Sequence, residues 1–269
     1  MHLATLYCPG VGNVDFELTE VFNEHEPVAA LASGPAVVYY RVAIMSKDGD
    51  WVIRETPAAC ERAMAVLESR GARYRLSAPL DVRWLQGGWS SHFEFFDDRQ
   101  RRVRCDFLSR PPRVSADSIV RLFSGTGSAP LLTVDVESLI QMKQTQRAKD
   151  YAVIGPLATL LPPGRELELT TDPDRIMALA AAQHGSASAR PAVKAARTGA
   201  GRRAVVVALA EEADDLQQRD RARVAVYEAA SARYFAECRR DTLISLPLRE
   251  AHGRMCEAAE RLLPMHPLE

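Results

Sequence analysis

The sequence predicts an α+β protein in which a mixed sheet with flanking helices is followed by a mainly helical C-terminal domain. Residues 34–110 are rich in β-branched and aromatic side chains and contain short turns, which is typical of strands. Beyond residue 135 apolar residues recur at helical spacing. The segment Pro162-Pro163-Gly164 interrupts this pattern, because paired prolines before a glycine cannot continue a helix. We therefore divide the chain into an α+β domain at residues 1–160 and a helical domain at residues 161–269.

Composition places the chain among ordinary globular proteins. It has 269 residues, of which 47% are hydrophobic and 26% are charged, so wholesale disorder is excluded. Its 34 basic and 35 acidic residues give a formal net charge of −1, which argues against a general polyanion-binding surface. No apolar run approaches the roughly 18–20 residues that cross a membrane, and the first residues lack a secretory signal. We expect a cytoplasmic protein without membrane contact. The five cysteines have no Cys-x-x-Cys spacing, which suggests neither a zinc knuckle nor a disulfide framework.

The elements follow from local signals along the chain. Thr56 can cap a helix over residues 57–70, Pro57 suits its first position and Gly71 ends it. Four strands are predicted, of which the last two form a hairpin: Arg73–Leu76, Asp81–Leu85, Trp89–Phe96 and Arg102–Leu108. Further helices are predicted in four places: after Ser115 to Phe123, from Asp135 to Ile154 where Gly155-Pro156 should break it, from Glu211 to Cys238, and from Leu248 to Leu263.

Paired acids make the segment Ser46-Lys47-Asp48-Gly49-Asp50 the most informative one. On a strand, residues i and i+2 point to one face, so Asp48 and Asp50 can bring two carboxylates into a small volume. Two carboxylates repel each other unless a cation neutralises them, and hard oxygen ligands suit Mg²⁺ or Mn²⁺. Asp106 is the natural third ligand of a two-metal site, because the alternation of Val103, Cys105 and Phe107 predicts that it lies on the polar face of its strand.

The same segment also fits a simple turn. Asp-Gly between two apolar runs is a strong β-hairpin signal, and here the runs are residues 37–45 and 51–53. On this interpretation Asp48 and Asp50 shape a turn and perform no chemistry.

In order and spacing, several segments between about residues 30 and 160 resemble the DNA polymerase β-like nucleotidyltransferase superfamily. The likeness is greatest to its abortive-infection and minimal nucleotidyltransferase toxins. The matching residues are Gly34-Pro35-Ala36, Ser46-Lys47-Asp48-Gly49-Asp50-Trp51, the helix start Thr56-Pro57, Asp106-Phe107-Leu108, Leu139-Ile140, and Lys143, Arg147, Lys149 and Asp150.

The resemblance implies a nucleotidyltransferase-like fold and a metal-dependent transfer of a nucleoside monophosphate from an NTP. The implied acceptor is an RNA or protein hydroxyl, such as a tRNA end or a protein side chain. The implied role is that of a bacterial toxin, active in a toxin–antitoxin or phage-defence system, with an antitoxin as partner. Asp48, Asp50 and Asp106 would be the catalytic and metal-binding residues, and Asp106 would help to deprotonate the acceptor. The implied nucleotide-binding residues are Gly34, Ser46, Lys47, Lys143 and Arg147.

A second hypothesis is that the fold is kept as a binding or interaction module and the chemistry is lost. Pro35 stands where the family has a second glycine or a serine, and proline has no backbone N–H to offer a triphosphate. Gly49 and Met45 also differ from the family, which has an apolar residue and an arginine at these points.

Basic residues and one histidine complete the candidates. Lys143 and Arg147, four residues apart, would share one helix face that either holds phosphates or is solvated and paired with Asp150. Residues 175–210 contain six basic and no acidic side chains, which fits either a phosphate-facing surface or a mobile alanine-rich linker. His92 has no Ser/His/Asp ordering around it and is expected to be an ordinary, satisfied histidine.

Overall fold

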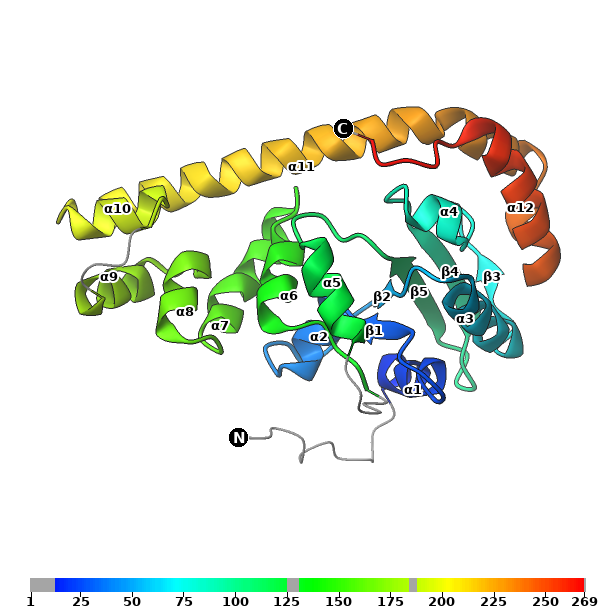
Figure 1. The fold of residues 1–269 in the computed structure, drawn as a ribbon, viewed down its shortest axis with the longest axis horizontal. Helices are drawn as coiled ribbons and strands as arrows, with labels where there is room; N and C mark the ends of the chain where they lie inside the picture. Colours follow the sequence, from blue (N-terminus) through cyan, green and yellow to red (C-terminus); the bar gives the residue numbers. More distant parts are fainter. Residues whose placement is uncertain (1–12, 125–130, 184–187, 269) are drawn as a thin grey trace.

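The computed structural model describes residues 13–124, 131–183 and 188–268. It confirms the α+β class: a five-stranded sheet is flanked by helices, and a helical region extends from one side of it (Figure 1). One long helix, α11, runs along the whole molecule from this helical region to the far side of the sheet (Figure 1).

The sheet is mixed and has the strand order β1-β2-β5-β4-β3. Its strands are β1 (Ala29–Leu31), β2 (Gly49–Ile53), β3 (Arg73–Tyr74), β4 (Ser91–Phe96) and β5 (Arg102–Leu108). The β2–β5 pair is parallel and the other pairs are antiparallel. The predicted hairpin of the last two strands is therefore confirmed, whereas the strand from Arg73 is shorter than predicted.

The helices on and beside the sheet are α1 (Val14–Phe22), α2 (Ser33–Tyr39), α3 (Pro57–Ser69), α4 (Val82–Leu85), α5 (Ala116–Phe123), α6 (Val136–Lys143), the 3₁₀ helix η1 (Ala148–Val153) and α7 (Ile154–Ala158). The later ones are α8 (Pro163–Leu169), α9 (Pro173–Ala182), α10 (Pro191–Arg197), α11 (Gly201–Arg240), the 3₁₀ helix η2 (Leu243–Ser245) and α12 (Leu248–Leu262). The cap of α3 and the start of α5 are those predicted, and the side chains of Thr56 and Ser115 accept hydrogen bonds from backbone N–H groups of the first turn.

Two predicted elements are wrong. Residues 81–85 form no strand: Asp81 accepts a hydrogen bond from the Arg83 N–H and caps the short helix α4. The single helix predicted from Asp135 to Ile154 ends at Lys143 and is followed by η1 and α7. Gly155-Pro156 does not break a helix but lies in the first turn of α7, where a missing N–H costs no hydrogen bond.

The two faces of the sheet are covered by different helices. Trp51, Phe93 and Phe107 point to one face and form the main core with α1, α3, α4 and α12. Val52 points to the other face and packs with α2, α5, α6 and α7. The predicted alternation in β5 is confirmed, since Val103, Cys105 and Phe107 are buried in the main core while Arg104 and Asp106 face the opposite way.

The last two helices complete the core of the sheet. Tyr234 of α11 and Met255 of α12 are fully buried in the main core, and the Tyr234 hydroxyl donates to the Ser77 carbonyl oxygen at 3.1 Å.

The division of the chain into two domains at residue 160 stays a prediction. Among the residues described, no helix is long and apolar enough to span a bilayer.

Candidate active site

The two strands β2 and β5 bring the predicted carboxylates to the same end of the sheet. Asp50 lies directly opposite Asp106 in the parallel register, and neighbouring strands are only about 4.8 Å apart. Asp48 precedes β2 and its carboxylate reaches over to Arg104 of β5. The alternative of a hairpin turn is wrong, because Gly49 and Asp50 belong to a strand whose antiparallel partner is residues 29–31.

Gly49 separates the two acids for a packing reason. A Cβ at this position would lie 2.4 Å from Cη2 of the buried Trp51 and 2.7 Å from Oδ1 of Asp15. No side chain fits there without a shift of the core, so the glycine serves close packing beneath the carboxylates.

Burial and mutual repulsion make these acids weak. The pKa of Asp50 is raised to about 7, first by burial and then by the charge of Asp106, against the lowering effects of Lys143 and of a hydrogen bond from the Gly34 backbone N–H. Burial raises the pKa of Asp106 to about 6, with a further rise from Asp48. Burial therefore penalises the ionised form of both carboxylates, and the repulsion between neighbouring acids adds to this penalty.

Two arginines partner the carboxylates, and the sequence reasoning missed both. Arg104 places Nη1 3.1 Å from Oδ1 of Asp48, and Arg75 places Nη1 3.1 Å from Oδ1 of Asp106. The Nε atom of Arg104 is buried without a hydrogen-bond partner. The strand alternation around Asp106 could have revealed Arg104, which lies two residues away on the same face, but no local signal points to Arg75 just beyond β3.

A third missed residue is Asp15 of α1. Its side chain is buried, and its pKa is raised to about 7 by burial and by the charges of Asp50 and Asp48. Asp15 lies against Gly49 and so adds a fourth acid near the ends of β2 and β5.

The start of α2 lies against the loop that precedes β2. The Ser46 hydroxyl donates to the Asp48 carbonyl oxygen at 2.9 Å, and a Cβ on Gly34 would lie only 2.1 Å from Ser46 Oγ. Gly34 therefore permits the close approach of this loop, and its N–H binds Asp50. Pro35 occupies the first turn of α2, where the helix needs no N–H from it. Lys47 is exposed in the same loop.

Lys143 points toward the carboxylates although it lies far from them in sequence. Its side chain is buried, its Nζ lies 3.2 Å from Ser33 Oγ and 3.7 Å from Asp150 Oδ1, and its charge lowers the pKa of Asp50. The shared helix face predicted for Lys143 and Arg147 is wrong, because α6 ends at Lys143. Arg147 is exposed and instead binds Asp150, with Nε 2.7 Å from Oδ2, so the expected local ion pair is present.

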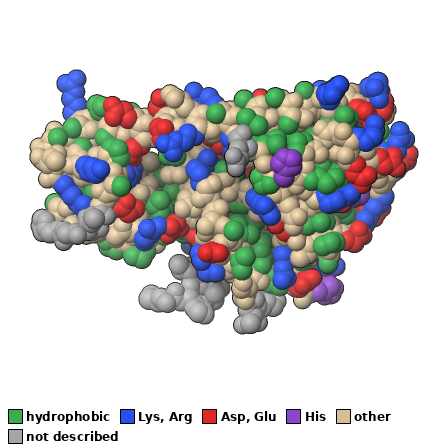
Figure 2. Space-filling model, turned by 45° about the horizontal axis from the view of Figure 1, so that its top comes forward, with side chains coloured by type: hydrophobic (Ala, Val, Ile, Leu, Met, Phe, Trp, Pro, Cys, Tyr) green, Lys and Arg blue, Asp and Glu red, His purple; other side chains and the backbone are tan. Residues whose placement is uncertain are grey.

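In the described part, the basic stretch at residues 175–210 is mostly helical rather than a linker, and half of its six basic side chains are paired with acids. Apart from residues 184–187, which lie outside the described part, most of it is helical in α9, α10 and α11. Three of its arginines bind acids from other segments: Arg175 with Glu166, Arg190 with Glu212 and Arg202 with Asp174. On the face drawn in Figure 2, basic and acidic side chains are interspersed.

His92 is satisfied, as expected. Its Nε2 lies 2.9 Å from Ser90 Oγ, and burial together with the Arg75 charge lowers its pKa to about 4. It lies opposite Asp106 on β4 and is neutral at physiological pH.

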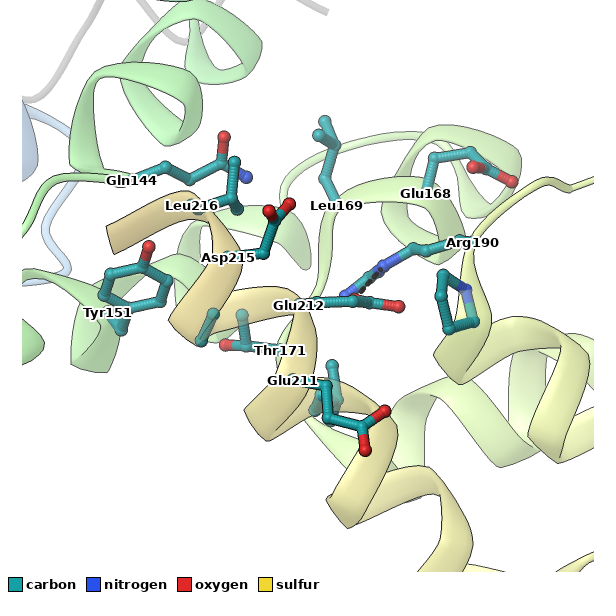
Figure 3. A pocket seen from close by; sticks show the side chains of 13 residues that line it. Gln144, Tyr151, Glu168, Leu169, Thr171, Arg190, Glu211, Glu212, Asp215 and Leu216 are labelled. Atoms are coloured by element: carbon teal, nitrogen blue, oxygen red, sulfur yellow. Dashed lines mark hydrogen bonds and ion pairs between the residues drawn. The ribbon is translucent and has the colours of Figure 1, made fainter. Parts of the chain in front are cut away.

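Two cavities flank the helical half of the molecule. One, of about 410 Å³, lies between η1, α8 and the middle of α11 (Figure 3). Four of its thirteen lining residues are acidic, Arg190 is bound to Glu212 there, and the Tyr151 hydroxyl is buried without a partner. The other, of about 350 Å³, lies between α11 and the segments around β4 and includes His92.

Comparisons with known proteins give two similar folds of low identity. No family model and no curated protein matches the chain. The crystal structure of JHP933 from Helicobacter pylori is similar at a TM-score of 0.39 and 10% identity, over 80% of this chain and 96% of that one. A second H. pylori structure is that of a protein proposed to be a nucleotidyltransferase. It is similar at a TM-score of 0.39 and 10% identity, over 77% of this chain and 95% of that one. Both TM-scores are below 0.5, so function is inferred below from the site itself.

The carboxylate oxygens suit a hard divalent cation, although Arg104 and Arg75 bind those of Asp48 and Asp106. Asp50 and Asp106 present carboxylate oxygens from paired positions on adjacent strands, and burial together with the neighbouring acids raises the pKa of both. Within residues 13–124, 131–183 and 188–268, no group of three His, Cys, Asp or Glu side chains is arranged as a metal site. Asp48 would join the other two as a ligand once its side chain leaves Arg104.

Proposed function

We propose that the chain is a metal-dependent nucleotidyltransferase that moves a nucleoside monophosphate from an NTP to a hydroxyl group. The observation that supports this most is the register pair Asp50 and Asp106, two acids of raised pKa side by side on the adjacent parallel strands β2 and β5. Such a pair is costly for a fold to keep, since each carboxylate penalises the ionised form of the other. Perturbed acids of this kind cluster at functional sites.

Each residue has a defined part in the proposed reaction. Asp50, Asp106 and a rotated Asp48 would hold Mg²⁺ or Mn²⁺, which supplies charge neutralisation at the transferred phosphoryl group. Lys143 lies on the α2 side of Asp50 and would bind the phosphates that leave. The acceptor oxygen forms its bond to the α-phosphorus while the bond to pyrophosphate breaks. Asp106 would also accept the proton of the acceptor hydroxyl.

Substitution of Asp106 tests the chemistry. Asp106→Asn keeps the shape but removes the charge and the proton acceptor, so turnover should fall at least 100-fold with Mg²⁺ and NTP, as expected for the loss of a general base. The exposed Asp98 of the β4–β5 turn gives a matched control, because Asp98→Asn makes the same change away from the site. Equal turnover in both variants would overturn the role of Asp106.

The phosphate grip is tested by calorimetry with Mg²⁺ and an NTP. Lys143→Ala should weaken binding about 10-fold or more, since one charge-assisted contact is worth about 1.5–3 kcal/mol and about 1.4 kcal/mol is tenfold. The exposed Lys149, six residues on, provides the control Lys149→Ala. Binding should weaken with salt, because charged contacts are screened. The same loss in both variants would contradict a specific role for Lys143.

A binding module without chemistry is the second candidate. The observation that favours it is the pairing of Asp48 and Asp106 with Arg104 and Arg75, which neutralises part of the acid cluster without a metal. This candidate predicts no NTP binding by the wild-type protein in Mg²⁺, which the same calorimetry measures. A toxin role with an antitoxin partner, and an RNA or protein acceptor, stay proposals tied to the first candidate.

A further inference from the structure

The smaller cavity, of about 350 Å³, opens beside the candidate site. His92 lines it, and His92 lies opposite Asp106 across the β4–β5 pair. The cavity therefore begins one strand beyond the carboxylates. Its outer wall is one stripe of α11 that contains Val224, Tyr227 and Ser231.

Aromatic rings line this cavity and are held in place. The Tyr227 hydroxyl donates to the Gly87 carbonyl oxygen at 2.8 Å and accepts from the Leu268 N–H at 3.2 Å. Gly88 has a φ of +82°, and a Cβ there would lie 2.5 Å from the Tyr227 oxygen. Trp89 meets the Tyr227 ring edge-on at 4.9 Å, and its Nε1 donates to the Pro264 carbonyl oxygen. The rings are thus oriented before any ligand arrives.

Charged side chains of both signs line the cavity, Arg223 and the exposed Glu228, and Arg223 is the one beside the aromatic rings. Arg223 lines it and lies 5.9 Å from the centre of the Tyr227 ring. Its counter-ion Asp220 also binds Arg113, each at 3.2 Å, so one carboxylate serves two guanidinium groups. The cavity wall at His92 adds no charge at neutral pH.

The order of groups across the sheet gives this cavity a place in the reaction. Asp50 on β2, Asp106 on β5 and His92 on β4 form a row across the sheet, and Lys143, which contacts Ser33 of α2, is coupled to Asp50 at the β2 end of this row. In phosphoryl transfer the attacking and leaving oxygens lie roughly in line on opposite sides of the phosphorus. If the leaving phosphates are at Lys143, the cavity is on the side of the acceptor.

We propose that this cavity binds the nucleobase of a nucleoside acceptor, whose sugar hydroxyl then lies at Asp106; the proposal rests on the proposed transferase function. Stacking on aromatic rings suits any nucleobase, and the cation beside the rings, Arg223, suits a sugar–phosphate. A tyrosine side chain fits less well, because its hydroxyl is on the ring itself and would stay in the cavity, one strand away from Asp106. A serine or threonine acceptor has no ring for these walls.

Direct binding of small ligands tests this cavity without metal or NTP. The probes are the four ribonucleosides, N-acetyl-tyrosinamide as a phenol, and short single-stranded RNA and DNA that end in the nucleoside bound best. Affinity is measured by calorimetry. Val224→Trp fills the cavity, whereas Val226→Trp puts the same side chain on an exposed position of the same helix. Thermal melting confirms that each variant folds, and Phe235→Leu, which removes one ring from the lining, replaces Val224→Trp if that variant does not fold.

The expected result is that a ribonucleoside binds the wild type and Asp50→Asn alike. Val224→Trp should weaken this binding at least 10-fold and Phe235→Leu at least 3-fold, while Val226→Trp should change it less than 2-fold. If an oligonucleotide binds more tightly than the nucleoside and its affinity falls with salt, the acceptor is the end of a nucleic-acid strand. If the two bind equally, the acceptor is a free nucleoside. Either result supports a nucleoside as the occupant of the cavity.

Three results would overturn the proposal: no nucleoside binding, equal loss in both tryptophan variants, or binding of the phenol in place of nucleosides. Its failure is distinguishable from failure of the transferase function. Nucleoside binding in a protein that neither binds nor turns over NTP with Mg²⁺ would retain the cavity as a nucleoside site and refute the transferase.

Discussion

Asp50→Asn should be more stable than the wild type, and its advantage should grow as the pH rises. The reason is that the wild-type carboxylate is held where ionisation is unfavourable. Asparagine has the same shape, and its Oδ1 can still accept the Gly34 N–H. The charge that Asp106 opposes is removed. A residue kept at a cost in stability is expected at a functional site, so this variant should gain stability and lose activity.

The magnitude follows from proton linkage. The pKa of Asp50 is about 7 in the native protein against 3.8 as the ordinary value. Because the native pKa is the higher one, between about pH 4 and pH 7 the native state keeps a proton that the unfolded state has lost, and the free energy of unfolding falls as pH rises. Each pH unit in that range costs up to about 1.4 kcal/mol. From pH 5 to pH 8 the wild type should therefore lose up to about 3 kcal/mol through Asp50, and Asp50→Asn should not.

Urea denaturation at pH 5 and pH 8, with a chelator present, measures this difference. The stability advantage of Asp50→Asn over wild type should be larger at pH 8 than at pH 5 by about 2–3 kcal/mol. Asp98→Asn, at the exposed turn, should track the wild type at both values. An advantage of equal size at the two pH values, or a variant less stable at pH 8, would refute the account of Asp50.

Three other predictions follow from packing and pairing. Gly49→Ala should lower the free energy of unfolding by about 1–3 kcal/mol, because its Cβ meets the buried core. Gly253→Ala, in open space on α12, should raise it by up to about 1 kcal/mol. Equal effects of the two variants in denaturation would contradict the packing role of Gly49. Asp220→Ala should lower the free energy of unfolding by about 3 kcal/mol, since two arginines and a backbone N–H lose this acceptor. Asp174→Ala, in an exposed ion pair, should change it by less than about 1 kcal/mol. Pro35→Ala should strengthen NTP binding in calorimetry if phosphate lies at the start of α2, because it restores a free N–H; unchanged affinity would place the phosphate elsewhere.

Much of the site could be predicted because its acids lie in strands with a clear alternation. The alternation of buried Val103, Cys105 and Phe107 predicts that Asp106 lies on the polar face of β5. Asp106 could be chosen as the partner of Asp50 from the alternation of its strand, but no local signal shows that β2 and β5 are adjacent and parallel. Arg75 and Asp15 come from separate elements, and only the folded chain brings them to the carboxylates.

The helical half shows where local reasoning fails. Lys143 and Arg147 have helical spacing, yet α6 ends at Lys143, and the two side chains meet at the carboxylate of Asp150 instead of sharing a helix face. The basic stretch has no acids of its own, and its partners Glu166 and Glu212 lie before and after it in the chain. An ion pair between distant segments leaves no trace in either segment alone.

By itself the sequence determined the α+β class, the helix starts at Thr56 and Ser115, and which side of β5 is polar. These features depend on groups within four residues of one another, such as a cap and its N–H or alternate side chains on a strand. Only the tertiary structure decided the strand order, the arginines on the carboxylates, and the course of α11 past the site. Those depend on burial and charge shared between residues far apart in the chain, where one element's side chains set the environment of another's.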